Sequence, residues 1–415
     1  MAPFDDLALP RPGSDTLRTV LSLALRRALA ELVPALHPRR ARGAVRRREL
    51  GALCTRLADV GRREPGALAQ ALRQPTVGTL LRCLRQADEP GAGDSALALE
   101  LALTLGTELA AARALGGRVE LTLPPGARPR VCALGLGAAW EAPADTRRIV
   151  LEDGVVRHEL AGRTHELALD PCGVGRLGPA GEPWLEVAYL PVAPGTALAL
   201  RDNNPLALLE AHPDKAGSGL DLGGRTPEAW VAALGAAREL VAEVLPELAR
   251  ELALAIPLCV PVGCYVDRHL SASYREALGI IYLSLHPSPL TMAEALVHEL
   301  SHNKLHALFE HDELLVDDAV PRHPSARRPD PRPLRGVLLA LHAFAPVAEL
   351  YARLLASGHP LMADVGARTR LATIVGGNRA DLDTLRSAMH PTAVGAALLE
   401  ELERVVGATP APPDA

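Results

Sequence analysis

The feature that most constrains this chain is residues 292–305, with the sequence MAEALVHELSHNKL, which predicts an amphipathic helix. His298 and His302 lie four residues apart, so on a helix both imidazoles face the same side and converge. Two neutral imidazoles in that arrangement can chelate one transition-metal ion. Glu299 projects about 100° around the helix from His298, close enough to reach a metal-bound water. The pattern therefore predicts a metal site.

Apolar residues flank the motif and indicate that the metal-facing side is sheltered; they are Ala293, Leu296, Val297, Leu300, Leu305 and Leu308. A β-like run at 279–285 and a proline-containing turn come before the helix, with Thr291 as the expected N-cap. We expect this strand to run along the edge of a cleft that holds an extended peptide. The alternative is that His298 and His302 are hydrogen-bonded core residues.

Composition excludes several classes of protein. The chain has 415 residues and is 48% hydrophobic, enough for two or three domains with a sizeable core. A net charge of −5 argues against a dedicated nucleic-acid binder. The six cysteines are scattered without a CxxC spacing and read as free thiols in a reducing compartment. With no visible signal peptide or uncharged membrane-spanning run, we expect a soluble, cytoplasmic protein without a membrane partner.

Apolar periodicity predicts an α+β fold that is predominantly helical. Residues 1–115 form an N-terminal helical region, with helices near 15–32, 49–60, 65–73, 76–86 and 94–114. Residues 116–225 alternate with a period of two and carry an Asp153-Gly154 hairpin signal, which predicts a small antiparallel β unit and a connector. Residues 226–408 form a zincin-like helical metal-binding domain with an edge strand, and residues 409–415 a disordered tail.

Within the metal-binding domain the chain predicts further elements in order. We expect a long helix at 227–255 and a short strand at 257–267. A Pro- and Arg-rich loop at 317–333 and a last pair of helices, at 333–357 and 381–406, follow the histidine-bearing helix. No internal repeat is visible.

A metal bound by two histidines needs at least one more protein ligand. Position 308, where a metzincin has its third histidine, is a leucine, and the acidic residues at 310–313 follow the motif too closely unless the chain turns sharply. His342 and Glu349 lie seven residues apart on a later predicted helix and therefore share a face. We select His342 as the third ligand and keep Glu349, the gluzincin arrangement, as the alternative.

Residues from about 261 to 351 resemble the HExxH-motif peptide-modification proteins of peptide natural-product (RiPP) clusters. The residues that carry the resemblance are His269-Leu-Ser-Ala-Ser273, Gly279-Ile-Ile-Tyr-Leu-Ser284, Ala295 to Leu305 with its HExxH, and Asp330-Pro-Arg-Pro-Leu-Arg-Gly336 with the following helix and His342. Characterised members look like Fe(II)/2-oxoglutarate-dependent β-hydroxylases. The resemblance covers roughly the middle-to-late quarter of the chain strongly and the rest weakly.

The resemblance implies an iron dioxygenase, an oxidoreductase that hydroxylates side chains of a ribosomal precursor peptide. Such an enzyme needs a facial set of three ligands with open positions for 2-oxoglutarate and O₂, here His298, His302 and His342. It also needs a cation for the distal carboxylate of 2-oxoglutarate. Arg332 and Arg335 are candidates, because a guanidinium meets a carboxylate in a bidentate fork. Glu299 would then orient a ligand or a water.

Three further side chains have open roles. Lys304 lies on a different helix face from the metal and either reaches a carboxylate at the cleft rim or pairs with Glu310 or Asp312. Ser271 and Ser273, just ahead of the strand, either lie near the cleft or cap a turn.

Two other functions fit the same sequence. In a gluzincin-like zinc peptidase, Glu299 would be the general base and Glu349 the third ligand. In a non-catalytic peptide-binding protein, the N-terminal helices and the β unit would form the interface and no metal would be needed. The sequence does not indicate the oligomeric state.

Overall fold

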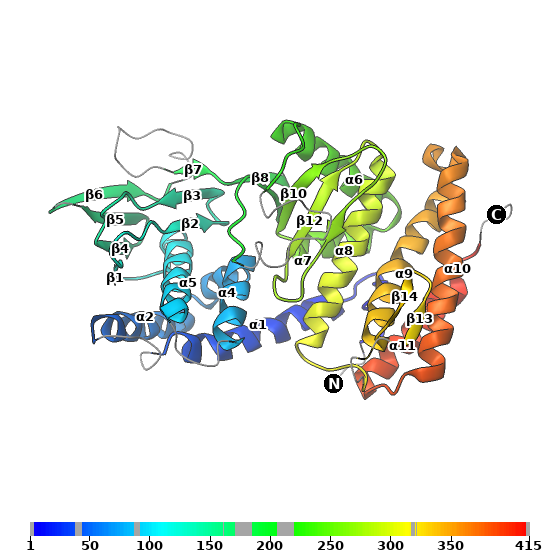
Figure 1. The fold of residues 1–415 in the computed structure, drawn as a ribbon, viewed down its shortest axis with the longest axis horizontal. Coiled ribbons are helices and arrows are strands. Elements are labelled where there is room, and N and C mark those ends of the chain that lie inside the picture. Colours follow the sequence, from blue (N-terminus) through cyan, green and yellow to red (C-terminus); the bar gives the residue numbers. More distant parts are fainter. Residues whose placement is uncertain are drawn as a thin grey trace.

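The computed structural model describes residues 4–37, 44–86, 92–160, 162–170, 185–205, 220–316, 320 and 322–411. In that part of the chain, eleven α-helices and several small sheets confirm the predicted α+β, predominantly helical fold. Figure 1 shows three groups in a row: N-terminal helices with antiparallel strands, a central mixed sheet with helices, and the helices that follow it.

Five helices form the N-terminal region, as predicted: α1 (Thr16–Ala35), α2 (Ala44–Arg63), α3 (Pro65–Leu72), α4 (Pro75–Gln86) and α5 (Ala92–Ala111). Leu101, Leu105 and Leu109 of α5 repeat every four residues and are fully buried. Gly106 lies between them, where a Cβ atom would collide with the side chain of Leu151. Glycine therefore allows α5 to pack directly on the neighbouring strand β4.

Two antiparallel sheets pack beside α5. One has the order β1-β4-β5-β6, from β1 (Val119–Thr122), β4 (Arg148–Glu152), β5 (Val155–Leu160) and β6 (Arg163–Ala168). The other has the order β2-β3-β7, from β2 (Arg130–Ala133), β3 (Ala138–Glu141) and β7 (Glu186–Val187). The predicted Asp153-Gly154 hairpin is confirmed: it joins β4 to β5, and Gly154 has the positive φ of 78° that such a turn requires.

The central sheet has the order β11-β12-β10-β9-β8, from β8 (Tyr189–Ala193), β9 (Thr196–Ala199), β10 (Leu258–Cys264), β11 (Ser271–Ala272) and β12 (Ile280–Leu285). It pairs strands from both sides of the predicted boundary at 225/226, since β9 runs parallel to β10. The predicted strands at 257–267 and 279–285 are confirmed. However, β12 lies inside the sheet with every residue buried, and the two-residue β11 is the edge.

Six helices cover and extend this sheet: α6 (Pro227–Val244), α7 (Pro246–Ala255), α8 (Pro289–Phe309), α9 (Leu334–Ala356), α10 (Val365–Ala388) and α11 (Ala393–Ala408). The single helix predicted at 227–255 is wrong, because Pro246 restricts Leu245 to a non-helical φ of −134°. The predicted helix at 381–406 is the end of α10 plus α11, which are separated near Pro391. The described part of the predicted loop at 317–333 contains a hairpin, β13 (His323–Ser325) with β14 (Arg328–Arg332).

Among the described helices, α9 is long and apolar enough to cross a membrane by length and composition alone. Most of it is buried, however, because it packs between α8 and α10. The apolar composition of α9 is thus explained by its place in the protein core.

Both ends of the described chain meet beside α8. Phe4, Leu7 and Ala8 are buried in one core cluster with α8, α9 and α11. The Leu9 N–H donates to Glu401 of α11 at 2.9 Å. The predicted tail begins at Thr409, yet this residue is buried and its hydroxyl donates to the Val405 carbonyl; residues 412–415 lie outside the described part.

Candidate metal centre

The histidine-bearing helix α8 is fixed at its start by Ser288 and Pro289. The Ser288 hydroxyl accepts a hydrogen bond from the Thr291 N–H at 3.3 Å, and Pro289 occupies the first helical position, where a missing N–H does no harm. The N-cap is therefore Ser288, and the prediction of Thr291 was wrong by three residues. This start sets the rotation of α8 and hence the side on which its histidines project.

His298 and His302 converge as predicted. Their Nε2 atoms lie 3.0 Å apart and their rings meet edge to face. Burial lowers the pKa of both imidazoles. The pKa of His298 is lowered further by the neighbouring His302, Arg327 and Arg370. The pKa of His302 is lowered less, because the negative charge of Glu299 partly opposes burial. Both rings are therefore neutral at physiological pH, the form in which imidazole binds metal.

Glu299 is held by both predicted serines. Ser271 and Ser273 each donate a hydroxyl hydrogen bond of 2.7 Å, one to each carboxylate oxygen. These bonds tie α8 to the edge strand β11 and its following residue. Ser271 and Ser273 thus lie at the site, where they orient Glu299.

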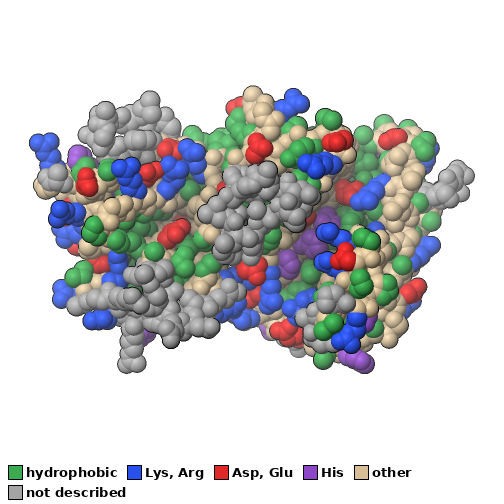
Figure 2. Space-filling view, in the orientation of Figure 1, with side chains coloured by type: hydrophobic (Ala, Val, Ile, Leu, Met, Phe, Trp, Pro, Cys, Tyr) green, Lys and Arg blue, Asp and Glu red, His purple; other side chains and the backbone are tan. Residues whose placement is uncertain are grey.

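A cavity of about 500 Å³ opens beside His298. It lies between α8, the residues around β11, and helices α9 and α10, and its wall includes His269, Ser271, Phe344 and Arg370. The Phe344 ring meets His298 edge on at 4.6 Å between centroids. Figure 2 shows histidine side chains gathered in a recess between the central and C-terminal groups. His298 is therefore accessible from a cavity, whereas His302 is not among the described residues that line it.

The cations near this cavity are Arg370 and Arg327. Arg370 lines the cavity and pairs with Glu294, while the Arg327 guanidinium lies 4.1 Å from the Phe344 ring centroid. Burial is the largest cause of the lowered pKa of His298, and His302 is the next. The positive charges of Arg327 and Arg370 lower this pKa further. Sequence reasoning missed Arg370, which stands in no recognisable motif, and placed Arg327 only in an Arg-rich loop.

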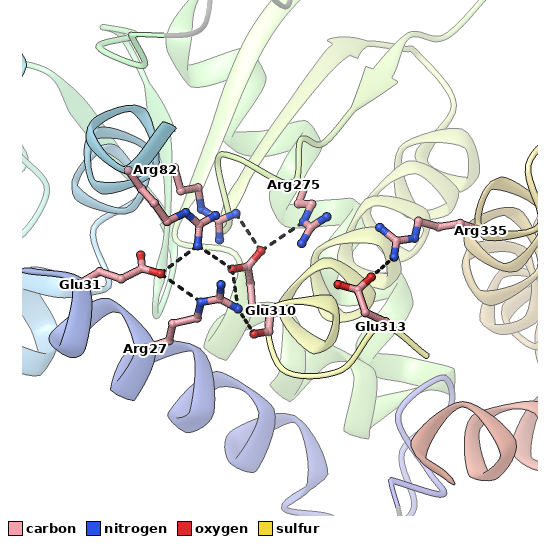
Figure 3. Close-up of polar contacts among 8 residues, drawn as sticks. Arg27, Glu31, Arg82, Arg275, Glu310, Glu313 and Arg335 are labelled. Atoms are coloured by element: carbon pink, nitrogen blue, oxygen red, sulfur yellow. Dashed lines mark hydrogen bonds and ion pairs between the residues drawn. The ribbon is translucent and has the colours of Figure 1, made fainter. Parts of the chain in front are cut away.

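The predicted carboxylate-binding residues lie elsewhere. Arg332 pairs with Asp330 at 3.2 Å on the exposed hairpin. Arg335 pairs with Glu313, as the right side of Figure 3 shows, and its guanidinium lies 4.4 Å from the centroid of the Phe309 ring. Neither arginine lines the cavity beside His298.

Both expectations for Lys304 are wrong. Its side chain is fully buried, and its ammonium donates to Glu251 of α7 at 2.5 Å and to the Ala8 carbonyl at 3.5 Å. Lys304 therefore neither reaches the cleft rim nor pairs with Glu310 or Asp312. It belongs to the core.

The structure does not bring His342 or Glu349 to the histidine pair. Within the described residues, no three His, Cys, Asp or Glu side chains are grouped so as to hold a metal ion. His342 is fully buried in α9, without a hydrogen bond of normal geometry to either ring nitrogen, and burial and then Lys304 lower its pKa. Glu349 pairs with Arg353 at 2.7 Å. The predicted ligand set is therefore only two-thirds assembled.

His269 is the additional histidine of this cavity. It lies two residues before Ser271, and its buried Nε2 has no hydrogen-bond partner. Burial lowers its pKa to about 4, although a hydrogen bond to the Ser284 main chain opposes this effect, so the ring is neutral. Helical periodicity could not reveal His269, because β12 separates it from α8. Its only signal was its place at the start of the first motif of the resemblance.

No model of a known protein family matches this chain, and no curated protein matches it either. The function has to be argued from the site itself.

Proposed function

We propose that this protein is a metal-dependent peptide-modifying enzyme, specifically an Fe(II)/2-oxoglutarate-dependent oxygenase that β-hydroxylates side chains of a ribosomally synthesised peptide. The carrying observation is the 3.0 Å between the Nε2 atoms of His298 and His302. With metal–nitrogen bonds of about 2.1 Å, donors at a right angle are about 3.0 Å apart and donors at a tetrahedral angle about 3.4 Å. The two donors are therefore close enough to share one metal ion in either geometry, and without metal the same distance is that of an N–H···N hydrogen bond between the two neutral rings.

His298 and His302 would hold the metal, and we infer that His269 supplies the third nitrogen. No three such side chains are grouped closely enough to hold a metal ion in the described part of the chain, so His269 would have to move toward the pair when metal binds. It lines the same cavity, its Nε2 is unpartnered, and its ring is hydrogen-bonded to the Ser284 main chain, a contact that fixes the orientation and tautomer of the imidazole. When bound, the metal supplies open positions for 2-oxoglutarate and O₂.

The surrounding residues support binding of the co-substrate and peptide. Arg370 lines the cavity and would offer its guanidinium to a carboxylate of 2-oxoglutarate in exchange for its pair with Glu294. Arg327 lies on the Phe344 ring and pairs with Asp381 at 3.6 Å, so it adds positive potential rather than a contact. Because β11 is the last strand of its sheet, a peptide substrate can add to it as a further strand. Glu299, held by Ser271 and Ser273, keeps α8 in register with that strand. In this proposal the enzyme acts in the cytoplasm on a peptide, without nucleic acid or membrane.

The zinc-peptidase alternative rests on Glu299 as a base near the metal. Both its carboxylate oxygens are already hydrogen-bonded to serines, and its expected third ligand, Glu349, pairs with Arg353. The arginines at the cavity have no role in that chemistry, whereas an oxygenase uses them. The oxygenase is therefore the better supported function.

The deciding experiment is anaerobic Fe(II) titration of the full chain, followed by an assay with candidate peptides. We expect the parent protein to bind iron stoichiometrically, and His298→Ala and His302→Ala to lose it. His269→Ala should bind iron ten- to hundredfold more weakly. His342→Ala and the control His359→Ala should bind iron like the parent. Peptide-dependent succinate and a product heavier by one oxygen atom should follow. Peptide cleavage with zinc would favour the peptidase, and absence of bound metal would favour a non-catalytic peptide binder.

A further inference from the structure

A second, larger cavity of about 770 Å³ lies between the N-terminal helices and the central sheet. Its wall comes from α1, α3, α4, strand β8, the turn after β8 and the end of α7. It shares no lining residue with the cavity beside His298. Its volume falls within the range of small-molecule sites in proteins.

The wall of this cavity is mainly aliphatic; its larger members include Leu21, Leu25, Leu72, Leu81, Leu134 and Leu136. Tyr189 is the one aromatic residue among the described lining residues. Burial raises the pKa of the wall residue Glu108 to about 7, although the Leu134 and Gly135 N–H groups bond to its carboxyl. Such a wall favours a flexible hydrocarbon chain, since each buried CH₂ group strengthens binding about fourfold.

The polar contacts of the cavity show where a charged group would bind. Arg27 and Arg82 line it, and each pairs with a carboxylate, Glu31 or Glu310, as Figure 3 shows. Arg73 is different: although the residue as a whole is exposed, its guanidinium lies against the protein and donates to the Leu254 carbonyl, and no carboxylate pairs with it among the described residues.

The guanidinium of Arg73 therefore has no carboxylate of its own among the described residues. Burial lowers the pKa of its guanidinium, and the nearby positive charge of Arg18 lowers it further. A carboxylate at this position would relieve that repulsion and accept two parallel hydrogen bonds from the guanidinium.

We propose that this cavity binds a linear aliphatic carboxylic acid, with the hydrocarbon chain along the leucine wall and the carboxylate on Arg73. The aliphatic lining argues for a hydrocarbon chain, and the one described lining arginine without a carboxylate partner argues for one acidic head group. The site is distinct from the metal centre and would exist whether or not the metal proposal holds.

Gly78 of α4 allows the cavity to be filled without disturbing the fold. It lines the cavity, and a Cβ atom there would have no neighbour within 4 Å. Gly78→Leu should therefore place a side chain in the cavity, and leucine is the better helix former. Gly376→Leu on α10 is the matched control, since it is also helical and open but far from this cavity.

The test is displacement of a fluorescent apolar anion from the full chain by octanoate, dodecanoate and uncharged methyl dodecanoate. We expect dodecanoate to bind more than tenfold tighter than octanoate. Arg73→Ala should weaken dodecanoate about tenfold and leave the methyl ester unchanged, while Arg62→Ala, a surface control, should change neither. Gly78→Leu should weaken both long-chain ligands at least tenfold, and Gly376→Leu should bind like the parent.

Several results would overturn the proposal: no saturable binding of dodecanoate, equal binding by Gly78→Leu, or an Arg73→Ala effect that is the same for the ester. Displacement by an apolar peptide but not by dodecanoate would assign the cavity to a peptide and also overturn it. Thermal unfolding of each variant establishes that a lost signal is not a lost fold.

Discussion

Lys304 is completely buried although it lies two residues after His302 of the candidate metal centre. Its partner, Glu251, is 53 residues away in sequence and is itself only 8% exposed. Desolvation raises the pKa of Glu251, and Lys304 partly opposes this effect. The sequence could not reveal this pairing, because the contact depends on how α7 packs on α8.

We expect Lys304→Met to destabilise the protein by about 3–5 kcal/mol, because it leaves the Glu251 carboxylate buried without a counter-charge. Chemical denaturation measures this change. The double variant Lys304→Met, Glu251→Leu should recover most of the loss. Arg353→Met, which breaks a more exposed pair with Glu349, should cost under about 1 kcal/mol, and an equal loss in both single variants would contradict this account.

Glu401 gives the protein a pH-dependent stability. Burial raises the pKa of Glu401 from 4.5 to about 7, although hydrogen bonds from the Leu9 N–H and other main-chain donors lower it in part. The Oε2 atom of Glu401 has no hydrogen-bond partner. The folded state therefore holds this proton more tightly than the unfolded state. The resulting stability is complete below pH 4.5 and is lost as the pH rises through about 7.

The variant Glu401→Gln should match the parent near pH 5 and be more stable at pH 8, by up to ~3 kcal/mol. Denaturation at both pH values measures the difference. The neighbouring exposed Glu400→Gln is the control and should stay within about 0.5 kcal/mol at either pH. A Glu401→Gln effect that does not change with pH would exclude titration of this carboxyl.

Among the elements, α8 depends on its N-cap. Ser288→Ala removes the side-chain acceptor of the Thr291 N–H and should destabilise the protein by about 1 kcal/mol. Thr291→Ala, which the sequence marked as the cap, should cost less than half as much. Thermal or chemical unfolding of the two variants compares the assignments directly, and the reverse order would restore Thr291 as the cap.

The long elements of this fold could be predicted because their apolar residues repeat with the period of a helix or a strand. The hairpin β13–β14 could not, since Pro324, Pro329 and Pro331 argue for a loop. Proline is tolerated there because an isolated two-stranded ladder leaves one edge of each strand unpaired. The sequence reading missed the break between α6 and α7 at Pro246, because the apolar residues keep their helical spacing through this proline.

At the scale of the whole molecule, Glu310 joins the N-terminal helices to the metal helix. It pairs with Arg82 at 3.1 Å and Arg275 at 3.2 Å, and Arg27 of α1 lies beside it (Figure 3). Burial opposes its ionisation, but these guanidiniums outweigh burial and lower its pKa. Its stabilising charge is therefore present above pH 4.5 and lost on acidification below that value.

Glu310→Gln should destabilise the protein by about 3 kcal/mol at pH 7, because several guanidiniums lose their shared counter-charge. We expect the N-terminal helices to become more sensitive to protease than the C-terminal helices. Glu313→Gln is the matched control, since that exposed carboxylate, three residues later, binds only at the surface of the same region. Equal behaviour of the two variants would contradict a joining role.

The candidate site was predictable only where it is local in sequence. His298, Glu299 and His302 lie within one helical turn, so spacing alone aligned them. His269, Arg327 and Arg370 come from three separate elements, and the packing of α9 and α10 and the β11–β12 connection determine their approach. No pattern along the chain encodes those distances, so His269 as third ligand and Arg370 as carboxylate-binding residue are proposals that come from the structure and not from sequence spacing.

The contact between Leu9 and Glu401 spans 392 positions of sequence. A ribosome adds about 5–20 residues per second, so roughly 20–80 s separate the synthesis of these two partners. Throughout that interval Phe4 and Leu7 lack the helix that will shelter them, and they are exposed to chaperones and to neighbouring nascent chains. Closure of the molecule around α8 is therefore a late event in its biosynthesis, and slow translation would prolong its aggregation-prone stage.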